Sequence, residues 1–79
     1  MKITPEIVAD IARDICEPRT PDLADFDRPL LDLGLDSLDY ASLLMALEEK
    51  YEIQFSNDDM ETLNTVNKIA AAIDARAKN

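Results

Sequence analysis

The chain has 79 residues, of which 47% are hydrophobic and 32% are charged, and its formal net charge is −9 at pH 7. This length predicts a single small domain over residues 1–79, and the acidic balance argues against partners rich in phosphate, namely nucleic acid and anionic membranes. The sequence contains no histidine, so a serine or cysteine nucleophile would lack its usual base, and we do not expect an autonomous hydrolase.

The first helix is predicted to begin at Thr4-Pro5-Glu6, which combines a capping hydroxyl, a proline suited to the first helical position and an early acid. Cys16, the only cysteine, lies near the expected end of this helix and fits a small buried filler. A single cysteine excludes an internal disulfide and, without a recognisable signal peptide or membrane span, predicts a reducing cytoplasm. Four residues are expected to form the buried face: Ile7, Val8, Ile11 and Ile15.

A connection of about twenty residues follows, because Pro18 and Pro21 interrupt the helical pattern. Connections of this length are usually either functional or disordered. Apolar residues spaced along it favour an ordered loop fastened to the core, with a short helical turn near Asp22–Asp25. These expected anchors are Leu23, Phe26, Leu30, Leu31 and Leu33.

The second helix is predicted over about Ser37–Tyr51, directly after Gly34, the only glycine of the chain. Glycine permits a sharp change of direction, while Asp36 and Asp39 have the spacing of an N-cap residue and its capping-box partner. Ser37 would then occupy the first helical position with a hydroxyl that capping does not need. Backbone N–H groups and the helix dipole favour an anion there, so a phosphodiester on Ser37 would suit the position.

This helix carries more apolar residues than one buried face requires. At about 100° per residue, one stripe is expected to face the core and a second to remain exposed beside two glutamates. We interpret the second stripe as a surface for a partner protein. The core stripe comprises Tyr40, Leu43, Leu44, Leu47 and Tyr51, and the partner stripe comprises Leu38, Ala41, Met45, Glu48 and Glu49.

Two further helices are predicted. Ser56 and Asp59 form a second capping-box pattern before a short helix that ends near Leu63, and Thr65 precedes a last helix. No alternation typical of strands occurs. The expected fold is an all-α four-helix bundle, with three longer helices, one short helix and a long loop between the first two. The core face of the last helix is expected to comprise Val66, Ile69, Ala70 and Ile73.

Several site chemistries are excluded by the motifs. No G-x-S-x-G sequence or glycine-rich phosphate loop occurs, and no histidine–cysteine cluster could bind zinc. The acidic residues Asp25, Asp27 and Asp32 lack the glycine and glutamate that a calcium-binding EF-hand loop has at fixed positions. We therefore predict neither a catalytic centre nor a metal site.

What remains is residues 33–38, Leu-Gly-Leu-Asp-Ser-Leu, followed by residues 43–49, Leu-Leu-Met-Ala-Leu-Glu-Glu. On these residues the chain resembles the acyl carrier protein family, and the similar order of elements extends over nearly all of its length. The resemblance implies that a phosphopantetheinyl transferase attaches 4'-phosphopantetheine from coenzyme A to Ser37. It also implies that Asp36 and Leu38 are the flanking residues that the transferase recognises.

The resemblance further implies that the second helix docks partner enzymes through a surface that includes Leu38, Asp39, Met45, Glu48 and Glu49. The expected partners are acyl- or aminoacyl-loading ligases, acyltransferases and synthases with basic docking surfaces. Residues 36–61 contain eight acids and one base, which agrees with such partners. The chain would be a monomeric, non-catalytic carrier without stable membrane insertion.

The nature of the cargo stays open. Ser42 stands where fatty-acid carriers commonly have an acid, and Lys50 interrupts the acidic run. Residues 64–69 also look somewhat like D-alanyl and other aminoacyl carriers. The alternatives are therefore a fatty acyl, polyketide or amino acid cargo and, in a different class of protein, an acidic interaction module without a prosthetic group.

Overall fold

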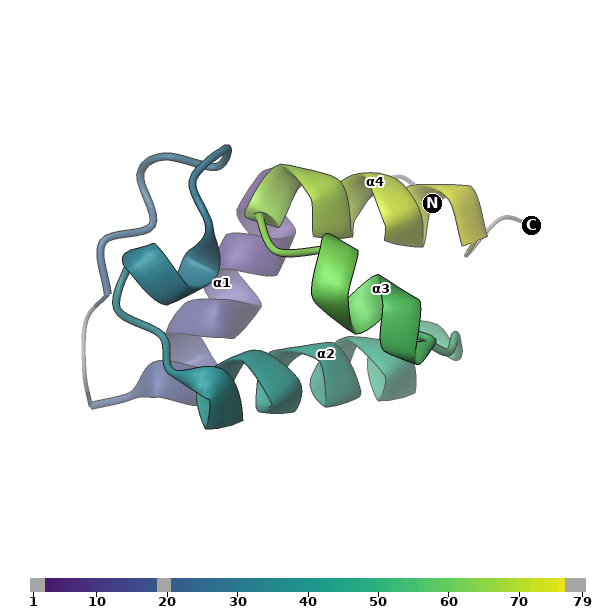
Figure 1. Cartoon of the computed structure of the whole chain (residues 1–79), viewed down its shortest axis with the longest axis horizontal. Coiled ribbons are helices and arrows are strands. Elements are labelled where there is room, and N and C mark those ends of the chain that lie inside the picture. The colour runs from purple at the N-terminus through teal and green to yellow at the C-terminus, as the bar shows by residue number, and fades with distance from the viewer. Residues whose placement is uncertain (1–2, 19–20, 77–79) are drawn as a thin grey trace.

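The computed structural model of the chain, drawn in Figure 1, describes residues 3–18 and 21–76. Within these ranges every regular element is a helix, so the predicted all-α bundle of three longer helices and one short helix is confirmed. The elements are α1 (Pro5–Cys16), the 3-10 turn η1 (Leu30–Asp32), α2 (Ser37–Tyr51), α3 (Asn57–Thr62) and α4 (Val66–Arg76).

Helix α1 begins where the sequence predicts, because the Thr4 hydroxyl accepts a hydrogen bond from the Ile7 N–H (3.4 Å) and Pro5 starts the helix. The predicted buried face is only partly right. Val8 is fully buried, but the isoleucines at positions 7, 11 and 15 are half-buried. The centre of the buried face consists mainly of small side chains, which let neighbouring helices approach closely. These residues are Val8, Ala9, Ala12 and Cys16.

The long connection between α1 and α2 is fastened by buried leucines, as expected for an ordered loop. Leu23 and Leu30 are 1% exposed, and Leu35, which the prediction omitted, is 3% exposed. Phe26 and Leu33 are half-buried and pack against the core. Leu31 was wrongly predicted as an anchor, since 55% of it is exposed.

The predicted helical turn near Asp22–Asp25 is also wrong, because the turn lies later, at η1. The Asp22 carboxylate accepts a hydrogen bond from the Ala24 N–H (3.1 Å), and the Asp25 carboxylate accepts one from the Asp27 N–H (3.0 Å). Such local side-chain bonds compete with the backbone bonds of a helix. The aspartates therefore stabilise local turns instead of a helix, and the helical turn of this loop forms later, at η1.

Helix α2 has the predicted bounds and the predicted core stripe. Leu43, Leu44 and Leu47 are completely buried, while Tyr40 and Tyr51 are half-buried at its two ends. The last turn ends at Glu52, whose backbone is left-handed with φ of 56°. The three leucines join α2 firmly to the common core.

Helix α3 starts with the predicted capping box, in which Ser56 Oγ accepts from the Asp59 N–H (3.1 Å) and the Asp59 carboxylate accepts from the Ser56 N–H (2.8 Å). Thr65 caps α4, since its hydroxyl accepts from the Lys68 N–H (3.1 Å). The four residues predicted for the core face of α4 are all buried: Val66, Ile69, Ala70 and Ile73.

The helices are arranged around one core. Helix α1 packs against both α2 and α4, and η1 packs against α2. Figure 1 shows α3 crossing the space between α2 and α4 on the side that faces the viewer. The loop is joined to the start of α4 by two backbone bonds, from the Leu30 N–H to the Asn64 carbonyl (2.8 Å) and from the Asn67 N–H to the Phe26 carbonyl (3.1 Å). This leaves the first turn of α2 at the edge of the bundle.

Candidate functional site

Ser37 lies at the first helical position of α2 and is exposed, as the sequence predicts. The chain reaches it through Gly34, whose φ of +109° is a backbone conformation that other residues rarely adopt. A Cβ at Gly34 would also lie 3.4 Å from the Pro21 Cβ. Leu35 then enters the core, so the chain turns outward again at Asp36 and Ser37.

The start of α2 is capped without the serine. Asp36 Oδ1 accepts a hydrogen bond from the Asp39 N–H (2.8 Å), and Asp39 Oδ2 accepts one from the Asp36 N–H (3.2 Å). Among residues 3–18 and 21–76, no hydrogen-bond partner is found for the Ser37 hydroxyl. The hydroxyl is therefore accessible and is not needed to hold the helix together.

The position fits a serine-linked phosphodiester. The first N–H groups of a helix carry partial positive charge, which favours a negative group on the first residue. The Ser37 side chain is exposed, so a long group attached to its oxygen can extend into solvent without displacing the core. The two neighbouring acids, Asp36 and Asp39, repel a phosphate, but both carboxylates are already engaged with backbone N–H groups.

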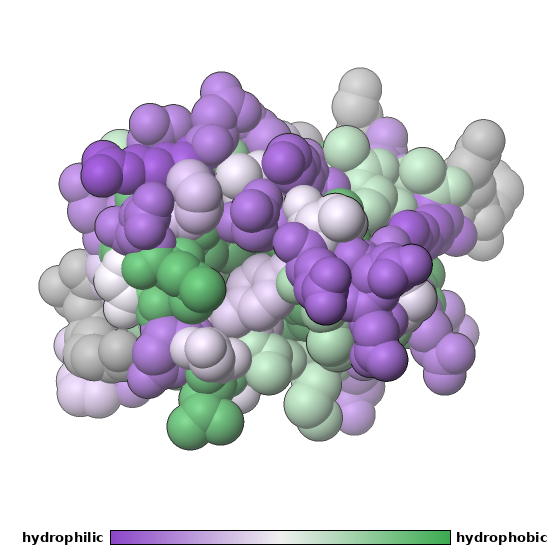
Figure 2. Space-filling view, viewed as in Figure 1, coloured by the Kyte–Doolittle hydropathy of each residue, from purple (hydrophilic) through white to green (hydrophobic). Residues whose placement is uncertain are grey.

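Two large apolar side chains of α2 are exposed: Leu38, next to this serine, and Met45, about two turns further along the helix. Leu38 is 77% exposed and Met45 is 64% exposed, whereas the predicted third member, Ala41, is only half-buried and so contributes part of its surface. Figure 2 shows hydrophobic atoms at the surface near η1 and at the start of α2, surrounded by more hydrophilic atoms. Exposed apolar residues with polar neighbours are typical of protein interaction sites.

The predicted docking acids differ in their environments. Glu49 is exposed, but Glu48 is half-buried and its carboxylate accepts a hydrogen bond from the Phe55 N–H (2.8 Å). The Glu48 carbonyl also accepts from the Ile53 N–H (3.1 Å). Glu48 therefore stabilises the turn that follows α2, and Glu49 is the more accessible acid. No sequence pattern indicated this bond, since its partner is a backbone group seven residues away.

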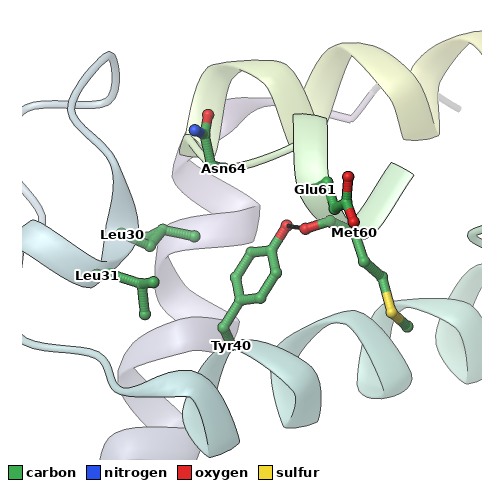
Figure 3. A pocket seen from close by; sticks show the side chains of 6 residues that line it. All are labelled: Leu30, Leu31, Tyr40, Met60, Glu61 and Asn64. Carbon is green, nitrogen blue, oxygen red and sulfur yellow. Dashed lines mark hydrogen bonds between the residues drawn. The ribbon is translucent and has the colours of Figure 1, made fainter. Parts of the chain in front are cut away.

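A pocket of about 180 Å³ lies between η1, α2 and the end of α3. Figure 3 shows the Tyr40 ring among the side chains that line this pocket, with Leu30 and Leu31 on one side of it and Met60 on the other. Sequence reasoning assigned Tyr40 to the core only and did not predict the pocket, which forms between segments far apart in the chain. Its lining residues are Leu30, Leu31, Tyr40, Met60, Glu61 and Asn64.

Polar contacts hold α3 over this pocket. The Tyr40 hydroxyl lies within hydrogen-bond distance of the carbonyl oxygens of Met60 (2.9 Å) and Leu63, and can donate its hydrogen to either. Burial, and secondarily the charge of Asp59, raise the pKa of Tyr40 above its usual value of 10.0. The hydroxyl therefore remains a donor at neutral pH.

A second contact joins α3 to α4. Both terminal nitrogens of Arg76 donate to the Asp59 carboxylate, at 2.7 and 2.9 Å, and the guanidinium lies 5.7 Å from the centroid of the Phe55 ring. The hydrogen bonds from Arg76, followed by that from the Ser56 backbone, hold the pKa of Asp59 well below its usual range. This bidentate pair is the geometry in which arginine and carboxylate interact best.

Comparison with known proteins decides the family. Residues 6–73 match the family described as "Phosphopantetheine attachment site". This chain belongs to that family. The match runs from the second residue of α1 to Ile73 in α4, with the exposed serine of α2 inside it.

Curated relatives carry the name acyl carrier protein. One from Bdellovibrio bacteriovorus is 40% identical over 47 residues, which are 60% of each chain. Another, from Buchnera aphidicola subsp. Acyrthosiphon pisum, is 54% identical over 37 residues, which are 47% of this chain and 46% of the relative. The matched segments thus span about half to three fifths of these relatives.

These matches confirm the predicted relation to the acyl carrier protein family and the predicted prosthetic group, covalently attached 4'-phosphopantetheine. Carrier proteins of this family are generally non-catalytic and interact with phosphopantetheinyl transferases and acyl-handling enzymes. In the described part of the chain, no group of three or more histidine, cysteine, aspartate or glutamate side chains could hold a metal ion. None of the helices described there is long and apolar enough to cross a bilayer.

Proposed function

We propose that this chain is a carrier that bears 4'-phosphopantetheine on Ser37 and delivers acyl or aminoacyl groups to partner enzymes. The observation that carries the proposal is the exposed Ser37 hydroxyl at the first position of α2. Asp36 and Asp39 form the helix cap, so the hydroxyl is not needed for it. The family match over residues 6–73 supports it, because this serine lies within the matched region.

Attachment would join the Ser37 oxygen to the phosphorus of the phosphopantetheine half of coenzyme A. The bond from that phosphorus to the nucleotide half breaks, and adenosine 3',5'-bisphosphate leaves. The hydroxyl proton passes to a base of the transferase, because this chain contains no histidine to accept it. Ser37 thus contributes the nucleophilic oxygen and the other enzyme contributes the catalysis.

We propose that the transferase recognises the chain through the two residues on either side of the serine, Asp36 and Leu38. Leu38 is 77% exposed, so it can enter an apolar recess of the enzyme, and its position next to Ser37 fixes the approach. Asp36 is also exposed, although its Oδ1 atom is engaged in capping. We expect Leu38 to contribute more binding energy than Asp36, since apolar contact gains more from leaving water.

Docking of later enzymes is proposed for the exposed side of α2. Met45 and Glu49 provide an apolar contact and an accessible charge, while Asp39 and Glu48 add charge from positions that are already hydrogen-bonded. Loading ligases, acyltransferases and synthases with basic surfaces would be drawn to this acidic region. Such complexes form rapidly and separate readily, which suits a carrier that visits several enzymes.

The carrier role agrees with the chemistry that the chain lacks. When bound, 4'-phosphopantetheine supplies a thiol that holds the cargo as a thioester on a long tether, at high effective concentration for the next enzyme. A carrier must not hydrolyse this thioester, and a chain without histidine has no neutral imidazole to activate water. We therefore propose a non-catalytic, monomeric domain that works in the reducing cytoplasm, where its single cysteine would remain a thiol.

The test is modification by coenzyme A and a broad-specificity phosphopantetheinyl transferase, followed by intact-mass measurement. The wild-type protein should gain the mass of one phosphopantetheine, and Ser37→Ala should gain none. Ser42→Ala is the matched control, because Ser42 is an exposed serine of the same helix, and it should be modified like wild type. An unmodified wild-type protein would contradict the proposal and favour an acidic interaction module.

A further inference from the structure

Two residues of the core stripe of α2, Tyr40 and Tyr51, have a polar hydroxyl, and Tyr40 is the one near the proposed attachment point. It follows Ser37 by three residues, a rise of about 4.5 Å at about 1.5 Å per residue. Its ring forms part of the wall of the pocket between η1 and α3, as Figure 3 shows. A flexible tether on Ser37 would therefore have this pocket within its reach.

The pocket has the size of a short hydrocarbon group. Its volume is about 180 Å³, and an apolar cavity of about 150 Å³ in another protein binds benzene, a molecule of six carbons. The walls are mainly apolar, made by Leu30, Leu31 and the ring of Tyr40, while Glu61 and Asn64 supply polar groups. Such a space suits the apolar end of a small acyl group and cannot contain a long chain without widening.

Widening would require α3 to move, and Tyr40 opposes that movement. The Tyr40 hydroxyl is bonded to the backbone carbonyls of Met60 and Leu63, at the end of α3 that borders the pocket. No residue of α3 itself, Asn57–Thr62, is fully buried, and its apolar packing against the core comes from the half-buried Met60. A second polar contact, between Asp59 and Arg76, joins α3 to α4 and does not involve the pocket residues.

We propose that Tyr40 determines the size of the cargo this carrier shelters, by filling the inner side of the pocket with its ring and by holding α3 in place with its hydroxyl. This inference rests on the proposed function, since the sheltered group is the cargo carried on Ser37. The preferred cargo is a short acyl group of about six carbons or fewer. Longer chains remain partly exposed to solvent.

The experiment compares carriers loaded with straight-chain acyl groups from acetyl to dodecanoyl, transferred from the matching acyl coenzyme A by a broad-specificity transferase. The rate at which hydroxylamine cleaves each thioester, and the melting temperature of each acyl form, report how far the chain is sheltered. In wild type, the acyl group exchanges between a state inside the pocket and a state in solvent. The equilibrium constant for entering the pocket should rise by up to about fourfold per added methylene. The rise should stop at about six carbons.

Tyr40→Ala removes the ring and should move this limit upward by at least about two carbons, because the space left by a six-carbon ring becomes available. Tyr40→Phe keeps the ring and removes the hydroxyl, so α3 can move away and the limit should rise by a smaller amount. The matched control is Tyr51→Phe, at the other end of α2, where the side chain does not line the pocket. That variant should keep the wild-type limit.

Circular dichroism establishes that each variant is helical before loading. If Tyr40→Ala does not fold, Tyr40→Phe decides alone, and an unchanged limit in that variant overturns the role of Tyr40. If Ser37 is modified but no chain length is protected in wild type, the pocket does not shelter cargo, and the proposed function survives without this inference. If wild type is not modified at all, both fail together.

Discussion

Helix α2 places Leu43, Leu44 and Leu47 completely out of solvent, whereas α3, all six residues of which the structure describes, has none that is fully buried. Both helices begin with a capping box of the same pattern. They differ in what holds them: α2 belongs to the core through apolar packing, and α3 is joined to its neighbours through Tyr40 and Arg76.

This difference separates two tasks within a small fold. The helix that carries Ser37 and the exposed Leu38 and Met45 is packed into the core, so the surface that we propose for partners keeps the same shape. The helix that borders the pocket is held by the half-buried Met60, by hydrogen bonds and by one ion pair, and such polar interactions make small net contributions in water. We therefore expect α3 to move at a smaller cost in free energy than α2.

The largest expected effect tests the difference in core packing between α2 and α3. Leu44→Ala should lower the free energy of unfolding by about 2–5 kcal/mol, because it leaves a cavity beside fully buried neighbours. Met60→Ala, at a half-buried position of the mostly exposed α3, should cost about 1 kcal/mol or less. Urea unfolding followed by circular dichroism measures both, with an unchanged m-value as evidence that the two-state transition is retained. Equal losses for the two variants would contradict the contrast between the helices.

The next effect concerns the two adjacent glutamates of α2. Glu48→Ala should lower the free energy of unfolding by about 1 kcal/mol, since the buried side of the turn loses the bond to the Phe55 N–H. Glu49→Ala, its matched control, should stay within about 0.5 kcal/mol of wild type because Glu49 is exposed. Binding to a basic partner should weaken in both. A destabilised Glu49→Ala with a normal Glu48→Ala would reverse our assignment.

A smaller effect should appear in acid and should be confined to α3. The Asp59 pKa is lowered by Arg76, so the stability that this pair contributes is complete above the usual value of 3.8 and is lost as the pH falls from there toward the lowered pKa. The melting temperature is measured as a function of pH from neutral to strongly acidic solution. The fall in melting temperature at acidic pH should be smaller for Asp59→Asn than for wild type. Asp58→Asn, an exposed neighbour in the same turn, is the control and should show the same fall as wild type.

The smallest effect expected is a response to salt. Residues 36–61 hold eight acids and one base, so their mutual repulsion should weaken as ionic strength rises from about 0.01 to about 0.15 M. We expect the melting temperature to rise by less than about 4 °C, which corresponds to under about 1 kcal/mol. Hydrogen exchange should localise the gain to α2 and α3 more than to α1. A melting temperature that does not change with salt would show that the repulsion is negligible.

The local parts of this structure were predictable because their signals are close together in the chain. The bounds of α2, the capping box of Asp36 and Asp39, and the exposure of Ser37 all depend on residues within one or two helical turns. The buried face of α4 followed from a regular helical period. Short-range steric and hydrogen-bonding rules suffice for such features.

Features that depend on distant partners were not predictable. The bond from the Phe55 N–H to Glu48 and the bonds from Tyr40 to α3 depend on how loops return to the bundle. The buried face of α1 was misplaced because small residues such as Ala9 and Ala12 occupy its centre, and apolar periodicity gives most weight to large side chains. Leu31 was predicted to be buried because it is a leucine, but its neighbour Leu30 occupies the core position and Leu31 is exposed.

The reciprocal bonds between Asp36 and Asp39 have a consequence for repeated use of the molecule. Since these two residues satisfy each other's backbone, the first turn of the helix keeps the same geometry whether the adjacent oxygen bears hydrogen or phosphorus. Adding or removing the prosthetic group would then require no refolding. The same molecule could be loaded with cargo and unloaded many times without a change in the structure of the helix start.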